Sequence, residues 1–263
     1  MANRLLVGLR IAYFGSILWG LIPNRIRRRL LFVLLLVESR CGPPDLAIRQ
    51  LYLLSDSMEW ILNERALAYG NGVHPKIRVM GYHSFFVDNV ISSGVIVDIG
   101  CGTGTVSHEI AINHKSAFVI GIDHDAHKIC AAKSRYTSPN LEFHVLDASQ
   151  VGSVLLNVQN SERAITVIMS NVLEHLEDRV VFLRRLVSEI RPKKLLIRVP
   201  SVERSWHVKF RKELGLPYFS DTDHKTEYTL EQLETEVEAC GFRISEYFLR
   251  WGEIWGICDQ VVS

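Results

Sequence analysis

The sequence predicts an α/β protein with a mostly parallel sheet, an antiparallel last strand and an N-terminal helical extension. Two observations predict this fold class. From residue 95 onward, short apolar runs rich in β-branched residues alternate with segments of helical character, and a glycine-rich turn follows the first run at once. Buried parallel strands read as continuous apolar runs, and alternating βα units bring them into one sheet. We therefore expect a helical extension over residues 1–75 and a ligand-binding domain over residues 76–263.

The expected elements of the second part follow one another along the chain. Strands are expected over residues 95–99, 117–122, 141–146, 164–170 and 193–199, and helices over residues 105–113, 126–135, from 171 onward and over 230–240. Two last strand-like segments, 242–249 and 254–262, read as a hairpin that adds the antiparallel strand. Ahead of this part, residues 46–70 carry apolar residues at helical spacing and end in a glycine, which predicts another helix.

Composition limits the classes of function. The 263 residues include 30 basic and 29 acidic ones, a formal net charge of +1, so no global positive field is available for sequence-independent binding of nucleic acid. We accordingly expect no nucleic-acid partner. The five cysteines are an odd number and include no C-x-x-C pair, which suits a reducing cytoplasm better than a disulfide framework or a zinc ribbon.

The apolar excess of the chain is concentrated near its start. An apolar stretch over residues 5–22 is interrupted by Arg10, and a basic run at 25–29 separates it from a second apolar stretch, 30–37. Neither stretch is a clean membrane span, because a spanning helix needs about 20 predominantly apolar residues. Two alternatives stay open: helices packed on the protein or a second subunit, or peripheral contact of residues 5–37 with the inner face of a membrane, arginines on anionic head groups.

The motif that carries chemistry is a D-x-G-x-G-x-G turn after the first strand. Glycines bring the backbone close to a ligand there, because they adopt strained torsions and have no Cβ. The dinucleotide fingerprint G-x-G-x-x-G would need a small residue where Thr105 stands, and no Gly-Lys-Ser/Thr of a P-loop follows.

The segment VDIGCGTG resembles the first motif of class I S-adenosylmethionine-dependent methyltransferases, which have a Rossmann-like sheet. The resemblance covers about residues 76–263 and implies S-adenosylmethionine as cofactor. It implies that Asp98 anchors the methionine end or the loop, that Asp123 binds the ribose hydroxyls, and that Asp147 binds the adenine amino group. The cofactor contacts implied in this way are Asp98, Gly100, Cys101, Gly102, Thr103, Gly104, Asp123, His124, Asp147, Ala148 and Asn171.

Candidate catalytic residues follow the fourth strand and precede the last helix. Glu174 and His175 lie in NVLEHLED, and His224 lies in DTDHKTEYT. A histidine suits base catalysis because its unperturbed pKa, about 6.5, is close to working pH. The two segments resemble the E-x-x-E-H and D-H-K-x-E motifs of small-RNA 3′-terminal 2′-O-methyltransferases, which implies Mg²⁺ or Mn²⁺ held by Glu174, His175 and His224. Asn171 stands where the first glutamate of that pattern would be.

The expected function is methyl transfer (EC 2.1.1.-) to a hydroxyl of a sugar, glycolipid or other small polyol. The chain also resembles ubiquinone-pathway O-methyltransferases and bacterial glycan-associated methyltransferases, so the histidine motif does not identify RNA as the acceptor. An insert over residues 200–219 carries Arg204, Trp206, Lys209 and Arg211. These side chains either contact an anionic or sugar-like acceptor or form a solvated helix face. The alternatives are a metal-dependent RNA 3′-terminal 2′-O-methyltransferase and a non-catalytic, membrane-associated scaffold that keeps the cofactor fold.

Overall fold

The second unit of the chain is an α/β domain around a seven-stranded sheet. The computed structural model describes residues 15–148, 150–152 and 163–261, and the chain divides into two compact units, Met1–His74 and Pro75–Ser263. The strands are β1 (Val95–Ile99), β2 (Phe118–Asp123), β3 (Leu141–Val145), β4 (Ile165–Ser170), β5 (Lys194–Pro200), β6 (Phe242–Arg250) and β7 (Glu253–Gln260). Their order in the sheet is β3-β2-β1-β4-β5-β7-β6.

The first five strands are parallel, and β7 pairs antiparallel with both β5 and β6. The expected fold class, a mostly parallel sheet with an antiparallel last strand, is thereby confirmed. Because β1 and β4 are neighbours that continue to opposite sides, their carboxyl ends form the switch point at which open α/β sheets bind ligands.

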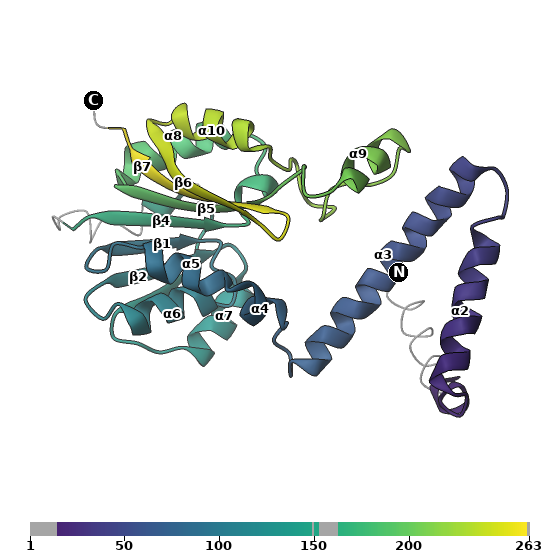
Figure 1. Ribbon diagram of the computed structural model, residues 1–263. Helices are drawn as coiled ribbons and strands as arrows, with labels where there is room; N and C mark the ends of the chain where they lie inside the picture. Colours follow the sequence, from purple (N-terminus) through teal and green to yellow (C-terminus); the bar gives the residue numbers. More distant parts are fainter. Residues whose placement is uncertain (1–14, 149, 153–162, 262–263) are drawn as a thin grey trace. The chain divides into compact units, whose positions relative to one another are not determined.

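Helices cover both faces of this sheet (Figure 1). The helices of the unit are α4 (Lys76–Met80), α5 (Tyr82–Asn89), α6 (Thr105–Asn113), α7 (Ala126–Arg135), α8 (Arg179–Ile190), α9 (Trp206–Glu213) and α10 (Leu230–Glu238). Side chains of α8 and α10, such as Leu186 and Leu233, are buried in one core cluster with Val97 and Ile197 of the strands. Side chains of α5 and α6 are buried in a second cluster that includes the stacked rings of Tyr82 and Trp255. The polar strand ends are thus held between two apolar layers.

One expected helix boundary is wrong. We expected a helix from Asn171, but residues 171–178 form a loop with a single 3-10 turn, Leu173–His175, and α8 begins only at Arg179. Asn171 has a φ of +56°, a left-handed conformation that is incompatible with an α-helix, and its backbone N–H donates to Arg198 O at 2.8 Å. Glu174 and His175 therefore lie in this loop after β4 rather than in a helix, Glu174 with its side chain buried and His175 partly exposed.

The first unit contains two long helices, α2 (Asn24–Glu38) and α3 (Pro44–Tyr69). The helix expected over residues 46–70 corresponds to α3. No helix in the described residues has the length and apolar character needed to cross a bilayer. The first part of the apolar stretch 5–22, with Arg10, lies outside the described residues.

Asn140 stabilises the connection between α6 and β3 through its side-chain amide. Its Nδ2 donates to the carbonyls of Ala111, His114 and Ala117 at 3.0–3.2 Å, which ties the end of α6 to the start of β3. In Asn140→Asp, a carboxylate oxygen would face these three carbonyls, so we expect a loss of about 1–3 kcal/mol in the free energy of unfolding by urea. The matched control is Asn113→Asp, whose amide meets one carbonyl on an exposed helix end. A loss in Asn140→Asp no larger than in the control would contradict this role.

Candidate active site

The glycine turn after β1 leaves open space at one of its three glycines. Gly100, Gly102 and Gly104 all have positive φ values, between +57° and +77°. A Cβ on Gly104 would lie 2.4 Å from the Phe143 ring, and one on Gly100 would lie 2.7 Å from Val172 Cγ2. A Cβ on Gly102 would meet no atom within 4 Å. The outer glycines are therefore required by packing, while Gly102 borders a space that a ligand can occupy.

Asp98 is buried at the end of β1 and accepts a hydrogen bond of 2.5 Å from Ser107 Oγ of α6. Burial raises the pKa of this carboxyl to about 7; the Ser107 hydrogen bond opposes the shift, and the charge of Asp123 adds to it. A buried carboxylate without a cationic partner is unfavourable, so the site favours a ligand that brings positive charge.

Asp123, at the end of β2, joins the two neighbouring turns. Its carboxylate accepts from the backbone N–H of Gly102 and of Asp125, both at 2.9 Å. These bonds fix the glycine turn relative to β2 and leave acceptor capacity on both oxygens. His124 is exposed, with Nδ1 3.5 Å from Asp123 Oδ1. Asp147, two residues beyond β3, is exposed near the same sheet edge.

Asn171, at the end of β4, is engaged by a cation of the protein itself. Arg198 of β5 donates through Nε to Asn171 Oδ1 at 3.0 Å, and its guanidinium lies 3.9 Å from the centre of the Tyr82 ring. Glu253 Oε2 lies 3.7 Å from the same Nε. The amide that replaces the first glutamate of the metal motif is thus held by an arginine.

Glu174 of the loop after β4 has a buried carboxyl group. Its side chain is fully buried, and neither carboxylate oxygen has a hydrogen-bond partner among the described residues. Burial raises its pKa to about 8, although the Arg198 charge opposes this shift. Buried polar groups are nearly always paired, so the orphaned carboxylate points to a missing cation or donor.

Two backbone hydrogen bonds bring the distant histidine segment to this loop. The carbonyl of Glu174 accepts from the N–H of Lys225 at 2.8 Å and of Thr226 at 3.3 Å. His224 consequently lies beside His175, with ring centres 4.9 Å apart. One possible ligand atom from each of Glu174, His175 and His224 lies within 4.8 Å of the others.

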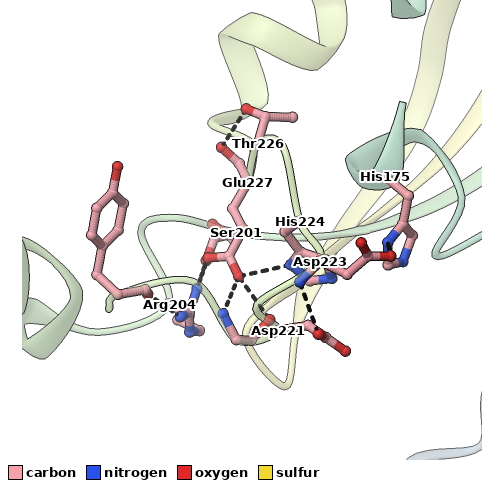
Figure 2. A network of polar contacts seen from close by, with 10 residues as sticks. His175, Ser201, Arg204, Asp221, Asp223, His224, Thr226 and Glu227 are labelled. Atoms are coloured by element: carbon pink, nitrogen blue, oxygen red, sulfur yellow. Dashed lines mark hydrogen bonds and ion pairs between the residues drawn. The ribbon is translucent and has the colours of Figure 1, made fainter. Parts of the chain in front are cut away.

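Each of the two histidines contacts a carboxylate through Nδ1. His175 Nδ1 is 3.2 Å from Asp223 Oδ2, and His224 Nδ1 is 3.2 Å from Glu227 Oε1 (Figure 2). This contact leaves Nε2 of each ring for a proton, a substrate or a metal ion. A carboxylate on the far ring nitrogen fixes the orientation of an imidazole.

Glu227 is the centre of a polar network at the base of the insert. Its buried carboxylate binds Arg204, the backbone and hydroxyl of Ser220, and His224. Arg204 also donates to the carbonyls of Ser201 and Tyr218. Arg204 lies in the turn before α9, so the solvated helix face is wrong for this residue, while a contact with the acceptor stays a prediction. Trp206 begins α9 and is 65% exposed.

Several residues of the site carry no functional assignment from sequence alone. Asp223 and Glu227 flank His224 in the chain, and their spacing to it could have indicated orienting carboxylates. Arg198 follows three buried apolar residues in β5, which is an unusual place for a charge. Ser107 carries no such signal, because a small polar residue on a helix is common.

The comparisons with known proteins agree with this geometry. A family model described as a methyltransferase domain matches residues 96–193, from β1 to the residue before β5. The ubiquinone biosynthesis O-methyltransferase of Bradyrhizobium diazoefficiens is 25% identical over 170 residues, which cover 59% of this chain and 64% of that protein. The chain thus spans less than two thirds of the length of that relative.

Two solved structures share the fold at low identity. Magnesium protoporphyrin IX methyltransferase from Synechocystis PCC 6803, with bound SAH, has a TM-score of 0.52 and 18% identity over 70% of this chain and 83% of its own. The small RNA methyltransferase HEN1 has a TM-score of 0.53 and 18% identity over 68% of this chain and 25% of its own. The sheet order, the glycine turn and the family match together define a methyltransferase domain. The family match over residues 96–193, the curated relative and the shared fold together support an S-adenosylmethionine-dependent methyltransferase of class I.

The pKa of Asp98 gives a prediction for cofactor binding. If Asp98 contacts the positively charged methionine end, a proton on its carboxyl must leave before binding, so affinity falls as pH drops below about 7. We expect the association constant of S-adenosylhomocysteine, measured by calorimetry, to be roughly tenfold lower at one pH unit below the pKa than well above it. Asp98→Asn should bind weakly with no such dependence on pH. An unchanged pH profile in this variant would contradict the assignment.

Proposed function

We propose that this protein transfers the methyl group of S-adenosylmethionine to a hydroxyl oxygen of a small-molecule acceptor, a sugar, glycolipid or other polyol. The observation that carries the proposal is the histidine pair at the carboxyl edge of the sheet, each ring held by a carboxylate. A hydroxyl is a poor nucleophile until it loses its proton, and oriented imidazoles next to a cofactor turn provide the base. The O-methyltransferase name of the Bradyrhizobium relative supports the same acceptor atom.

In the proposed reaction, different residues bind the cofactor and accept the proton. The methyl carbon passes from sulfur to the acceptor oxygen, the sulfur keeps the bonding pair, and the hydroxyl proton goes to a base. Asp98 and Asp123 are proposed to anchor the two ends of the cofactor that flank the glycine turn. His175 or His224 accepts the proton at Nε2, while Asp223 or Glu227 at Nδ1 stabilises the imidazolium that results. This arrangement needs the acceptor oxygen in line with the carbon–sulfur bond.

A divalent cation fits the same residues. The donor set is one orphaned carboxylate and two imidazoles whose other ring nitrogens are already held, which is how metal-binding histidines are usually supported. Glu174, His175 and His224 would hold Mg²⁺ or Mn²⁺, and such an ion lowers the pKa of a bound hydroxyl. Arg198 restricts the site to these three side chains, because it engages Asn171 Oδ1.

An RNA 3′-terminal 2′-O-methyltransferase is the second candidate. The residues that favour it are the three possible metal ligands and the adjacent Asp223 and Glu227, which follow the motif pattern of that family. The near-zero net charge favours a small acceptor instead, since RNA binding draws most of its affinity from phosphate contacts. Methyl transfer to any acceptor would exclude a non-catalytic scaffold.

The proposed base role predicts a separation of catalysis from binding. An acceptor is first identified by screening a glycan and lipid library with methyl-labelled cofactor. The variants His224→Gln and His175→Gln are then assayed separately with that acceptor. Loss of the proton acceptor should lower the rate of transfer by about 10²–10⁴-fold in at least one of them, with unchanged affinity for S-adenosylhomocysteine. The control is His144→Gln, a partly exposed residue of β3 paired only with Glu142. Full activity in both variants would refute the histidine base.

The metal proposal is tested by binding as well as by activity. We expect one Mn²⁺ per chain in a titration followed by electron paramagnetic resonance, weakened at least about tenfold in Glu174→Gln and His224→Ala. Glu142→Gln is the control, since Glu142 is exposed and contacts only His144. No Mn²⁺ binding, together with methyl transfer that survives chelator treatment, would leave the direct histidine mechanism.

A further inference from the structure

Helix α2 carries an apolar surface that the described part of the chain leaves uncovered. Its second half is eight consecutive apolar residues, 30–37, each between 41% and 64% exposed. No residue of α2 is buried. In a folded protein, such a run is expected inside a core.

The run surrounds the helix rather than forming a stripe. Successive residues are about 100° apart, so eight of them cover every side over about 12 Å of helix length. A helix that is apolar all round is buried in protein or in a membrane. Packing against one flat protein surface would cover one side alone. A depth of about 12 Å is also too short to cross a hydrocarbon core of about 30 Å.

Positive charge precedes the run directly. Arg25, Arg27, Arg28 and Arg29 occupy the first turns of α2, and none of them has an ion-pair partner within residues 15–148, 150–152 and 163–261. Three of these arginines border a hollow of about 570 Å³ together with apolar side chains of the same helix: Arg25, Arg28, Arg29, Leu31, Phe32 and Leu35. Guanidinium groups beside an apolar wall match an amphiphile that has an anionic head and an acyl chain.

We propose that α2 docks this protein on an anionic phospholipid surface, with Arg25, Arg28 and Arg29 on the phosphates and the 30–37 run inserted among the acyl chains. A second copy of the chain would be a poorer partner, because α2 offers one acidic residue, Glu38, against four arginines. Lipid phosphates supply the missing negative charge, and acyl chains contact all sides of the helix at once. This inference concerns the first unit and does not depend on the proposed methyl transfer.

The test is flotation of the full chain with vesicles of phosphatidylglycerol and phosphatidylcholine, compared with vesicles of phosphatidylcholine alone. We expect flotation with the anionic vesicles, weakened by salt. The triple variant R25E/R28E/R29E and the double variant F32Q/L34Q should each lower the partition coefficient by about tenfold or more. Retained S-adenosylhomocysteine binding in the variants would show that the second unit is folded.

Two matched controls make the result specific. K115E/K193E/R243E changes net charge by the same amount on exposed sites of the second unit, and I112Q/V181Q removes two exposed apolar side chains there. Both should float like the parent chain. Equal loss in the controls, or no flotation of the parent chain, would overturn the proposal. So would a dimer in light scattering that F32Q/L34Q dissociates, since a second copy would then cover α2.

Discussion

The cluster of Glu174, His175 and His224 depends on the backbone carbonyl of Glu174. Two backbone N–H groups, of Lys225 and Thr226, donate to this one oxygen and join the loop after β4 to a segment fifty residues later. These bonds bring His224, and with it Glu227 three residues later, next to His175. Arg204, Ser220 and the insert are arranged around Glu227 in turn. Two backbone hydrogen bonds to the Glu174 carbonyl thus bring the side chains of His175 and His224 together.

The glycine turn after β1 rests on local sequence, which is why its conformation could be predicted from the residues. A β-branched run predicts β1, and glycines at alternate positions predict a turn with positive φ; Gly100, Gly102 and Gly104 have these torsions. The acids of the next strands fall at the same edge because parallel strands end together. The start of α8 was misplaced, since the left-handed Asn171 depends on Arg198, twenty-seven residues away. Long-range pairs such as Arg204 with Glu227 also have no local pattern that predicts them.

Two buried carboxyls make the ligand-free site electrostatically unfavourable. Burial raises the pKa of Asp98 to about 7 and of Glu174 to about 8, well above the values of an unfolded chain. The folded state therefore holds protons that the unfolded state releases. The contribution of these groups to stability is complete at acid pH and is lost as pH rises toward 7 and 8. A bound ligand that carries positive charge stabilises the ionised carboxylates. Binding of such a ligand therefore raises the free energy of unfolding near neutral pH.

Arg198 affects which of the two proposed routes, a divalent cation or a histidine base, could activate a hydroxyl. A carboxylate at position 171 would add a fourth ligand and negative charge for a metal ion, but here the amide of Asn171 accepts from a guanidinium. That guanidinium is stacked on Tyr82 and paired with Glu253, so its position is fixed from three sides. Its charge stabilises ionised Glu174 and at the same time repels a second cation. In the proposed reaction, the residues around Asn171 would weaken metal binding relative to a four-ligand site. The histidine pair, with its own orienting carboxylates, would then take the proton directly.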